Sequence, residues 1–280
     1  MLLAVLSGFI FALFLVPFGK VLKGKWSILL SVLPLALFIF FLQKIPQVIE
    51  GGIIEQNQWV PQLGINLDFN LDGLSLIFAL MITGVGTMVF IYTSYYLKGH
   101  VYLDRFFGFL CLFMGAMLGL VLSENLITLF LFWELTSISS FFLIGFNNED
   151  PASRKSALIA LSVTGLGGLC LLAAGLVIHG ITDSFSIVDM LQSSTLIQDH
   201  SFFMAVVFLI FGAAFTKSAQ FPFHFWLPGA MKAPTPVSTY LHSATMVKAG
   251  IYLLFRLSPA FSGSEFWHYS LWCVGGATMV

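Results

Sequence analysis

The stretch LITLFLFWELTSISSFFLIGF, from Leu126 to Phe146, decides the fold class of this chain. A helix needs about 20 mostly apolar residues to cross the hydrocarbon core of a bilayer, and this stretch supplies them with a single charge, Glu134. A charged side chain at the centre of a membrane helix costs about 2.5–3.5 kcal/mol on insertion scales. The sequence therefore predicts a membrane helix whose one carboxylate has a partner, a proton or a function.

The rest of the chain has the same apolar character. Of its 280 residues, 58% are hydrophobic and 9% are charged, whereas soluble domains carry about 25% charged residues. We predict an all-α, polytopic membrane helix bundle. The net charge of −1 gives no reason to expect nucleic acid as a partner. The cysteines lie singly in apolar runs, without the spacing of metal ligands, at Cys111, Cys170 and Cys273.

Apolar runs of roughly spanning length recur along the whole chain. The first lacks the basic residues and the small-residue cleavage site of a signal peptide, so we expect it to be a retained membrane helix. The last run reaches Val280 without a polar residue after it, which favours a fragment of a longer chain. The candidate spans are 2–18, 26–42, 74–97, 106–122, 126–146, 157–179, 202–221, 237–257 and 267–280.

The distribution of basic residues predicts the orientation of these spans. Cytoplasmic loops of membrane proteins carry an excess of Lys and Arg. With the N-terminus outside, the inner loops hold Lys20, Lys23, Lys25, Lys98, Arg105, Arg154, Lys155 and Lys232, and the outer side holds only Lys44 and Arg256. The outer loops are acidic, with Glu50, Glu55, Asp68, Asp183, Asp189, Asp199 and Glu265. We predict a multi-pass protein of the cell membrane with its N-terminus outside.

Glu134, Lys217 and Lys248 are the charges that fit no loop. Such residues usually face a bundle interior or a wet cavity and pair with one another. Our hypothesis is that Glu134 and Lys217 form a pair that exchanges protons; the alternative is an ion pair that only fixes helix packing. Ser137 lies three residues after Glu134 on the same helix face and is a secondary candidate.

The segment SAQFPFHFWLPGAMKAPTPVS, residues 218–238, contains Pro222, Pro228, Pro234 and Pro236. Because proline removes a helix hydrogen bond and clashes with the preceding turn, we predict a broken helix near 217–236, with an ordinary proline-rich inner loop as the alternative. His224 lies in this break.

His242 and Lys248 share the next predicted span but lie six residues apart. In an α-helix this spacing points them about 120° from each other, so we expect Thr245 to bridge their two faces. His242 has a side chain suited to a proton relay, although a packing role is an equal alternative for it and for His224. In the span 157–179, the run TGLGGLCLLAAG predicts close helix packing.

Three stretches resemble one family: LDGLSLIFALMITGVGTMVFIY (71–92), LFLFWELTSISSFFLIGF (129–146) and TKSAQFPFHFWLPGAMKAPTPVSTYLHSATMVKAGIYLL (216–254). They are similar to the antiporter-like membrane subunits shared by respiratory complex I and Mrp-type multi-subunit sodium/proton antiporters, most of all to the large A-type member of the latter. The resemblance implies inverted helix repeats, of which this chain holds the first. It divides the chain into N-terminal helices (1–122), a first repeat (123–258) and the start of a further helix (259–280).

The resemblance also implies a function. Glu134, Lys217, His242 and Lys248 match the family's proton-transfer residues, and other membrane subunits, protons, sodium and the lipid bilayer are the implied partners. The chain is then a transporter component rather than an enzyme, with no cofactor or metal. Two alternatives stay open: a proton-pumping subunit of a complex I type quinone-linked dehydrogenase, and a structural membrane scaffold.

Overall fold

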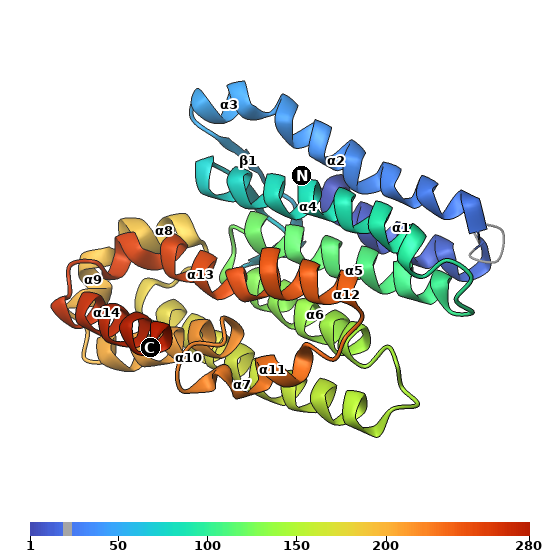
Figure 1. The fold of residues 1–280 in the computed structure, drawn as a ribbon. Coiled ribbons are helices and arrows are strands. Elements are labelled where there is room, and N and C mark those ends of the chain that lie inside the picture. The colour runs from blue at the N-terminus through green and yellow to red at the C-terminus, as the bar shows by residue number, and fades with distance from the viewer. Residues whose placement is uncertain (19–23) are drawn as a thin grey trace.

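The computed structural model describes residues 1–18 and 24–280, and only the backbone of residues 16–18, 24–26 and 63. Within these residues, four helices are long and apolar enough to cross a membrane: α4 (Gly73–Tyr96), α5 (Leu103–Leu122), α6 (Leu126–Ile144) and α7 (Pro151–Thr182). Shorter apolar helices cover Leu2–Leu15, Ser27–Gln43 and Phe203–Lys217. Figure 1 shows these helices packed into one bundle, which confirms the predicted all-α membrane fold.

The remaining helices complete the bundle and its ends. They are α1 (Leu2–Phe18), η1 (Gly24–Ser31), α2 (Val32–Gln43), α3 (Ile45–Ile49), η2 (Pro61–Leu63), α8 (Ile187–Gln192), α9 (Ser194–Gln198), α10 (Phe203–Lys217), η3 (Phe223–Phe225), α11 (Trp226–Ala230), α12 (Thr235–Val237), the π-helix η4 (Ser238–Ala244), α13 (Met246–Phe261) and α14 (Glu265–Met279).

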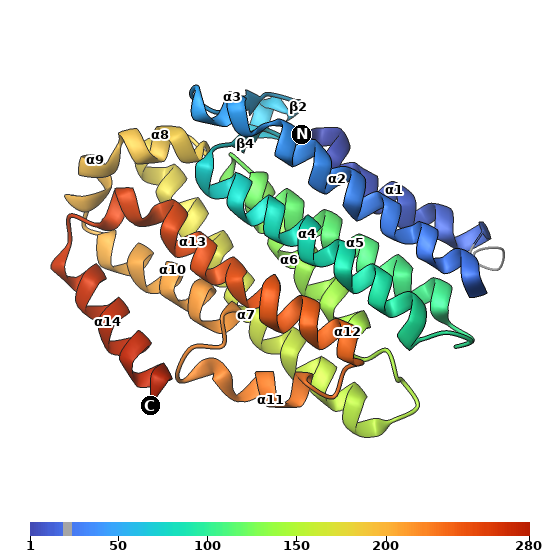
Figure 2. The ribbon, with the colours of Figure 1, turned by 45° about the horizontal axis from the view of Figure 1, so that its top comes forward.

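Helix α5 lies at the centre of the N-terminal part, where α1, α4, α6 and α13 all pack against it. Figure 2 shows α4 and α5 running together between the blue N-terminal helices and the rest of the bundle. Gly8 lets α1 approach α5 closely, because a Cβ at this position would lie 2.6 Å from the carbonyl oxygen of Cys111. The first predicted span is thus an integral part of the bundle.

Several long helices begin at polar residues that the sequence places before an apolar run. The Asp72 carboxylate accepts a hydrogen bond from the backbone N–H of Ser75, whose hydroxyl in turn accepts from the N–H of Asp72, which is a capping box. Asn125 caps α6 and Asp150 caps α7, where Pro151 occupies the first helical position. These caps satisfy backbone donors that would otherwise be left without partners.

Four short strands, which the sequence did not lead us to expect, lie at one end of the bundle. β1 (Ile53–Glu55) pairs with β4 (Phe69–Leu71), and β2 (Gln58–Val60) pairs with β3 (Ile65–Asn66), both antiparallel. Isolated bridges join Phe69 to Ser123 and Asn125 to Ser186, so this end also holds the loops around α8. We call it the strand end.

The opposite end, which we call the break end, holds the proline-rich segment. The loops 97–102 and 145–150 meet residues 232–235 around a cavity of about 430 Å³ there. The break predicted near 217–236 is confirmed, since α10 ends at Lys217 and only short helices follow before η4. The spans predicted at 202–221 and 237–257 were therefore wrong in detail. The first stops at Lys217, and the second is a π-helix to Ala244 followed by α13.

Candidate functional site

Lys217 is fully buried at the last turn of α10. Its ammonium nitrogen donates to the hydroxyl oxygen of Ser137 at 2.7 Å and to the carbonyl oxygen of Trp133 at 3.0 Å. The same nitrogen lies 5.1 Å from the centre of the Trp133 ring, within the range of a cation–π contact. The Lys217 side chain, which the sequence placed at the helix break, is therefore bound by a single turn of α6.

Glu134 lies on that same turn but does not pair with Lys217. Among the described residues, no oxygen of Glu134 lies within 4.0 Å of the lysine nitrogen. Its Oε1 atom is buried and has no hydrogen-bond partner in the described chain. The carboxylate lies against Gly168 of α7, where a Cβ would overlap Oε1 and lie 2.7 Å from Cδ. A direct contact between Glu134 and Lys217, both of them described, is thus not formed, and the proton exchange between them stays a prediction.

Ser137, a secondary candidate, contacts Lys217 directly, whereas the Glu134 carboxylate does not. The neighbouring hydroxyls of Thr136, Ser139 and Ser140 instead donate to carbonyl oxygens of their own helix, at 2.7–2.8 Å. This is the ordinary behaviour of hydroxyls in membrane helices. Ser137 donates in the same way, to the carbonyl oxygen of Trp133 at 3.3 Å, and differs from the other three because it also accepts from Lys217.

His242 is buried, with 7% of its surface exposed, and lies in the π-helix η4. Neither ring nitrogen has a hydrogen-bond partner among the described residues. The ring packs edge-on against Trp226, with centroids 6.0 Å apart. Trp226 in turn donates its ring N–H to the carbonyl oxygen of Thr216 at 2.9 Å. This hydrogen bond links Trp226, and with it His242, to the turn that carries Lys217. Single π-helical turns occur frequently at functional sites.

Thr245 does not bridge His242 and Lys248, contrary to our expectation. Its hydroxyl donates to the carbonyl oxygen of Tyr240 at 2.6 Å. The expectation assumed one continuous α-helix, whereas Thr245 lies at the junction between η4 and α13 with a non-helical backbone. Lys248 is half-buried, and its side chain makes no hydrogen bond or ion pair with the described part of the chain.

His224 is exposed in the break and stacks on Phe221, with ring centroids 6.0 Å apart. The structure therefore does not bring it to the buried group around Lys217.

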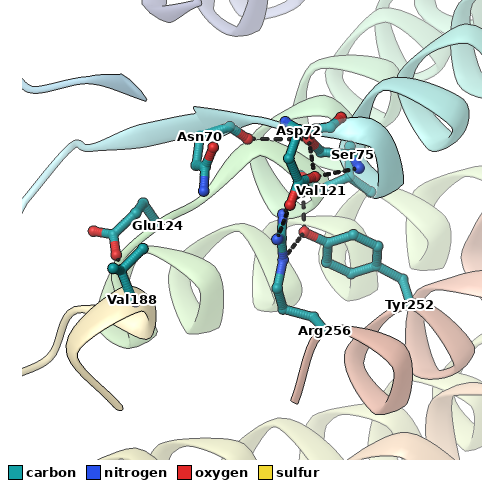
Figure 3. A network of polar contacts seen from close by, with 8 residues as sticks. All are labelled: Asn70, Asp72, Ser75, Val121, Glu124, Val188, Tyr252 and Arg256. Atoms are coloured by element: carbon teal, nitrogen blue, oxygen red, sulfur yellow. Dashed lines mark hydrogen bonds and ion pairs between the residues drawn. The ribbon is translucent and has the colours of Figure 1, made fainter. Parts of the chain in front are cut away.

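Arg256 is a further interior charge that sequence analysis missed, because we counted it among the basic residues of the outer side. It lies within α13, is 7% exposed, and forms an ion pair with Asp72 at the start of α4. Figure 3 shows Arg256 reaching Asp72 with Tyr252 beside it. Tyr252 accepts from the Arg256 Nε–H at 3.0 Å and donates to the carbonyl oxygen of Val121 at 2.8 Å. Tyr252 and Arg256 lie one helical turn apart in the sequence, and this spacing could have indicated that their side chains meet.

The ion pair changes the titration of Asp72. Burial alone would raise the pKa of its carboxyl, but the charge of Arg256 and the hydrogen bonds from Arg256 and Ser75 outweigh burial and hold the pKa below its usual value. This network joins α4, α5 and α13 at the strand end.

Glu124, also missed by sequence analysis, lies between α5 and α6 at the strand end. Its Oε1 accepts from the Ser186 hydroxyl at 2.7 Å and from the Val188 N–H at 2.9 Å, as Figure 3 shows for Val188. Burial raises the pKa of the Glu124 carboxyl; the charges of Asp68 and Asp189 act in the same direction, and the two hydrogen bonds act against it. These acids border a cavity of about 340 Å³.

Comparison with known proteins places these residues in a family. Residues 123–280 match the family described as "NADH:quinone oxidoreductase/Mrp antiporter, TM". Residues 59–107 match the family described as "NADH-Ubiquinone oxidoreductase (complex I), chain 5 N-terminus". Two curated relatives are Na(+)/H(+) antiporter proteins: the A component from Alkalihalophilus pseudofirmus, 46% identical, and the A1 component from Staphylococcus aureus, 47% identical. Each alignment covers 99% of this chain and 35% of the relative.

Solved structures resemble the chain as well. A chain in the structure of the Mrp complex from Dietzia sp. DQ12-45-1b is 37% identical, with a TM-score of 0.88 over 98% of this chain and 30% of that chain. A chain of a membrane-bound sulfane sulfur reductase, an archaeal respiratory membrane complex, is 21% identical with a TM-score of 0.80 over 95% of this chain and 54% of that chain, a likeness of fold alone. The chain spans about a third of the length of the curated relatives that it matches.

Proposed function

Because the chain belongs to the NADH:quinone oxidoreductase/Mrp antiporter transmembrane family, we propose that it is a proton-translocating part of a multi-subunit sodium/proton antiporter. The observation that supports this most is the arrangement of Lys217 and Glu134. A fully buried lysine and a carboxylate oxygen without a hydrogen-bond partner lie at the same turn of α6 with no ion pair between them. Charges inside a membrane bundle are costly and are typical of proton relays.

In this proposal, protons pass between the groups whose buried polar atoms lack partners. Glu134 Oε1 and both ring nitrogens of His242 can each take up or release a proton, and ordered water is their natural partner in a polar site. Lys217 is held on Ser137, whose hydroxyl both accepts and donates. Lys248, half-buried and unpaired within the described chain, continues the series along α13.

The proposed division of the chain follows from these positions. Residues 123–258 form the proton-transferring repeat, which contains Glu134, Lys217, His242 and Lys248. Residues 1–122 are supporting helices, and residues 259–280 begin a further helix. The partners are other membrane subunits of the antiporter complex, and the ions are protons and sodium. The names of the curated relatives favour this function over the complex I alternative.

The proposed orientation places the break end in the cytoplasm and the N-terminus outside, in the cell membrane. The loops at the break end carry Lys98 and Lys232, Arg154 and Lys155 lie at the start of α7, and Arg105 lies in the first turn of α5. Basic residues concentrate on the cytoplasmic side of membrane proteins. Of the other predicted inner residues, Lys20 and Lys23 lie outside the described residues, and the side chain of Lys25 does as well.

The test uses the full-length protein in its assembled complex. Sodium-dependent collapse of a preformed pH gradient is measured in inverted vesicles for the natural protein, for Glu134→Gln and for the control Glu149→Gln, an exposed acid at the break end. At matched amounts of complex, we expect Glu134→Gln to slow exchange about tenfold or more, since a positioned proton-transfer group contributes at least that much. Unchanged exchange in Glu134→Gln would contradict the proposal.

A further inference from the structure

The Glu134 carboxylate rests on a gap in the surface of α7. Helices α6 and α7 pack side by side, and Gly165 and Gly168 of α7 lie opposite Glu134. A Cβ on Gly168 would overlap Oε1, whereas a Cβ on Gly165 would lie 3.8 Å from Oε2, an ordinary contact. The gap that holds the carboxylate therefore depends on one residue, Gly168.

This position is not an ordinary place for a carboxylate. Oε1 is buried and lacks a hydrogen-bond partner among the residues described, and an unsatisfied buried polar group carries a free-energy penalty. Nearby, the Lys217 nitrogen is hydrogen-bonded to Ser137 and Trp133. The carboxylate thus lies in the gap on α7, whereas the lysine is hydrogen-bonded to α6.

We propose that Gly168 is a positioning residue for Glu134: its missing side chain gives the carboxylate a seat against α7 that keeps it out of contact with Lys217. This inference rests on the function proposed above and deepens it. A carboxylate locked to an ammonium group keeps its charge over a wide pH range, whereas a carboxylate held apart from the lysine is free to exchange protons. In this position the Glu134 carboxylate stays at the same turn of α6 as Lys217 but forms no ion pair with it.

A matched control lies in the same helix. Gly180 of α7 has no atom within 4 Å of the position that its Cβ would take. Gly180→Ala therefore adds the same methyl group to α7 and removes the same backbone freedom, without touching Glu134. Any general effect of alanine on α7 appears in both variants.

The first experiment measures thermal stability of the purified complex in a double-mutant cycle. Gly168→Ala is expected to lower the unfolding temperature in the natural background and to have little effect beside Glu134→Ala, because the two Glu134 atoms within 3.0 Å of the new Cβ are then removed and Trp133 Cδ1 lies 3.3 Å away. An equal loss in both backgrounds would assign Gly168 to helix packing and overturn the inference. This readout does not depend on transport.

The second experiment measures exchange against pH in vesicles. Displaced from α7, the carboxylate moves toward Lys217, and a nearby ammonium stabilises its charged form. We expect the pH profile of Gly168→Ala to move by about one pH unit to lower pH, that of Gly180→Ala to stay, and Gly168→Ala/Glu134→Asp, with its shorter side chain, to move back. If Glu134→Gln abolishes exchange yet Gly168→Ala matches Gly180→Ala, the positioning role fails while the proposed function stands. If Glu134→Gln leaves exchange intact, the proposed function itself fails.

Discussion

Charged side chains inside the bundle are accommodated in three different ways. Arg256 has an ion pair with Asp72, Lys217 has a hydroxyl and a carbonyl oxygen as acceptors, and Glu134 has a glycine that leaves room for it. The ion pair suits a fixed charge, because both partners are held in one geometry. The other two arrangements hold the lysine and the carboxylate without an ion pair, which suits groups that change their proton occupancy.

At the residue scale, Asp72→Asn tests the ion pair without removing the helix cap, because asparagine caps helices about as well as aspartate. Arg256 would remain buried without its counter-charge. Asp72 is 37% exposed and Arg256 7%, so the expected loss of stability lies between the about 1 kcal/mol of an exposed pair and the about 3–5 kcal/mol of a buried one. Thermal unfolding of the purified complex measures it, with Asp199→Asn, an exposed aspartate, as control.

The same pair predicts a pH dependence. The pKa of Asp72 is lower in the folded protein than its usual value of 3.8, so its contribution to stability is present above pH 3.8 and is lost as the pH falls through the folded value. The natural protein and Asp72→Asn should therefore differ in stability at neutral pH and converge below pH 3.8. A difference that stays constant into acid would exclude the ion pair as its cause.

At the scale of the element, glycines and prolines decide how the helices meet and where they stop. Gly167 lets α7 approach α10, since a Cβ there would overlap the hydroxyl of Thr216. Helix α10 ends at Lys217 because Ala219 has a left-handed backbone (φ 50°) and the N–H of Gln220 turns back to the carbonyl oxygen of Phe215 at 2.9 Å, as in a Schellman C-cap. Pro222 and the prolines after it then keep a regular helix from resuming at once. The lysine is consequently at a helix end, where its long side chain can reach α6.

Gly250→Ala tests the contact between α10 and α13. A Cβ at Gly250 would overlap the carbonyl oxygen of Ala214 and the hydroxyl of Ser218, which itself donates to the carbonyl oxygen of Val247 at 2.6 Å. Overpacking of this kind costs about 1–3 kcal/mol, so the variant should unfold at a lower temperature and assemble poorly. Gly108→Ala in α5, with no atom within 4 Å of its Cβ, should be neutral or stabilising. Equal behaviour of the two would refute the close contact.

At the scale of the whole molecule, the two ends of the bundle differ in charge and construction. The strand end holds β1–β4, α8 and α9 together with Asp68, Glu124 and Asp189 around one cavity. The break end holds Lys98 and Lys232 in its loops and Arg105, Arg154 and Lys155 at the starts of α5 and α7. The interior charges also lie at different ends: the Arg256–Asp72 network lies at the strand end, and Lys217 lies where α10 ends toward the break.

Cysteine labelling tests the orientation of these ends. In a protein whose other cysteines are replaced, Glu50→Cys and Asn148→Cys each place one exposed thiol at the strand end and the break end, respectively. A membrane-impermeant maleimide added to intact cells should label Glu50→Cys and should reach Asn148→Cys only after permeabilisation, if the basic break end is cytoplasmic. The reverse pattern would place the N-terminus inside.

Much of this architecture could be predicted from the residues in order. The apolar runs predicted the helices, the prolines predicted the break after Lys217, and the unpaired charges identified Glu134, Lys217 and Lys248 as interior. The short strands escaped prediction because segments of two or three residues carry too few alternating positions to show a pattern. The π-helix escaped because its residues have the composition of an α-helix, so His242 and Lys248 could not be placed relative to each other.

The sequence by itself determined which segments enter the membrane and where helices begin and break. These are local properties, since each spanning helix must satisfy its own backbone hydrogen bonds and each proline acts on its own turn. Only the tertiary structure decided the partner of each interior charge. Lys217 meets Ser137 across 80 residues, Arg256 meets Asp72 across 184, and Glu134 meets a glycine rather than the lysine. The partner of each charge depends on which helix faces pack together and on where a glycine leaves space between them. The residue spacing along a single helix determines neither.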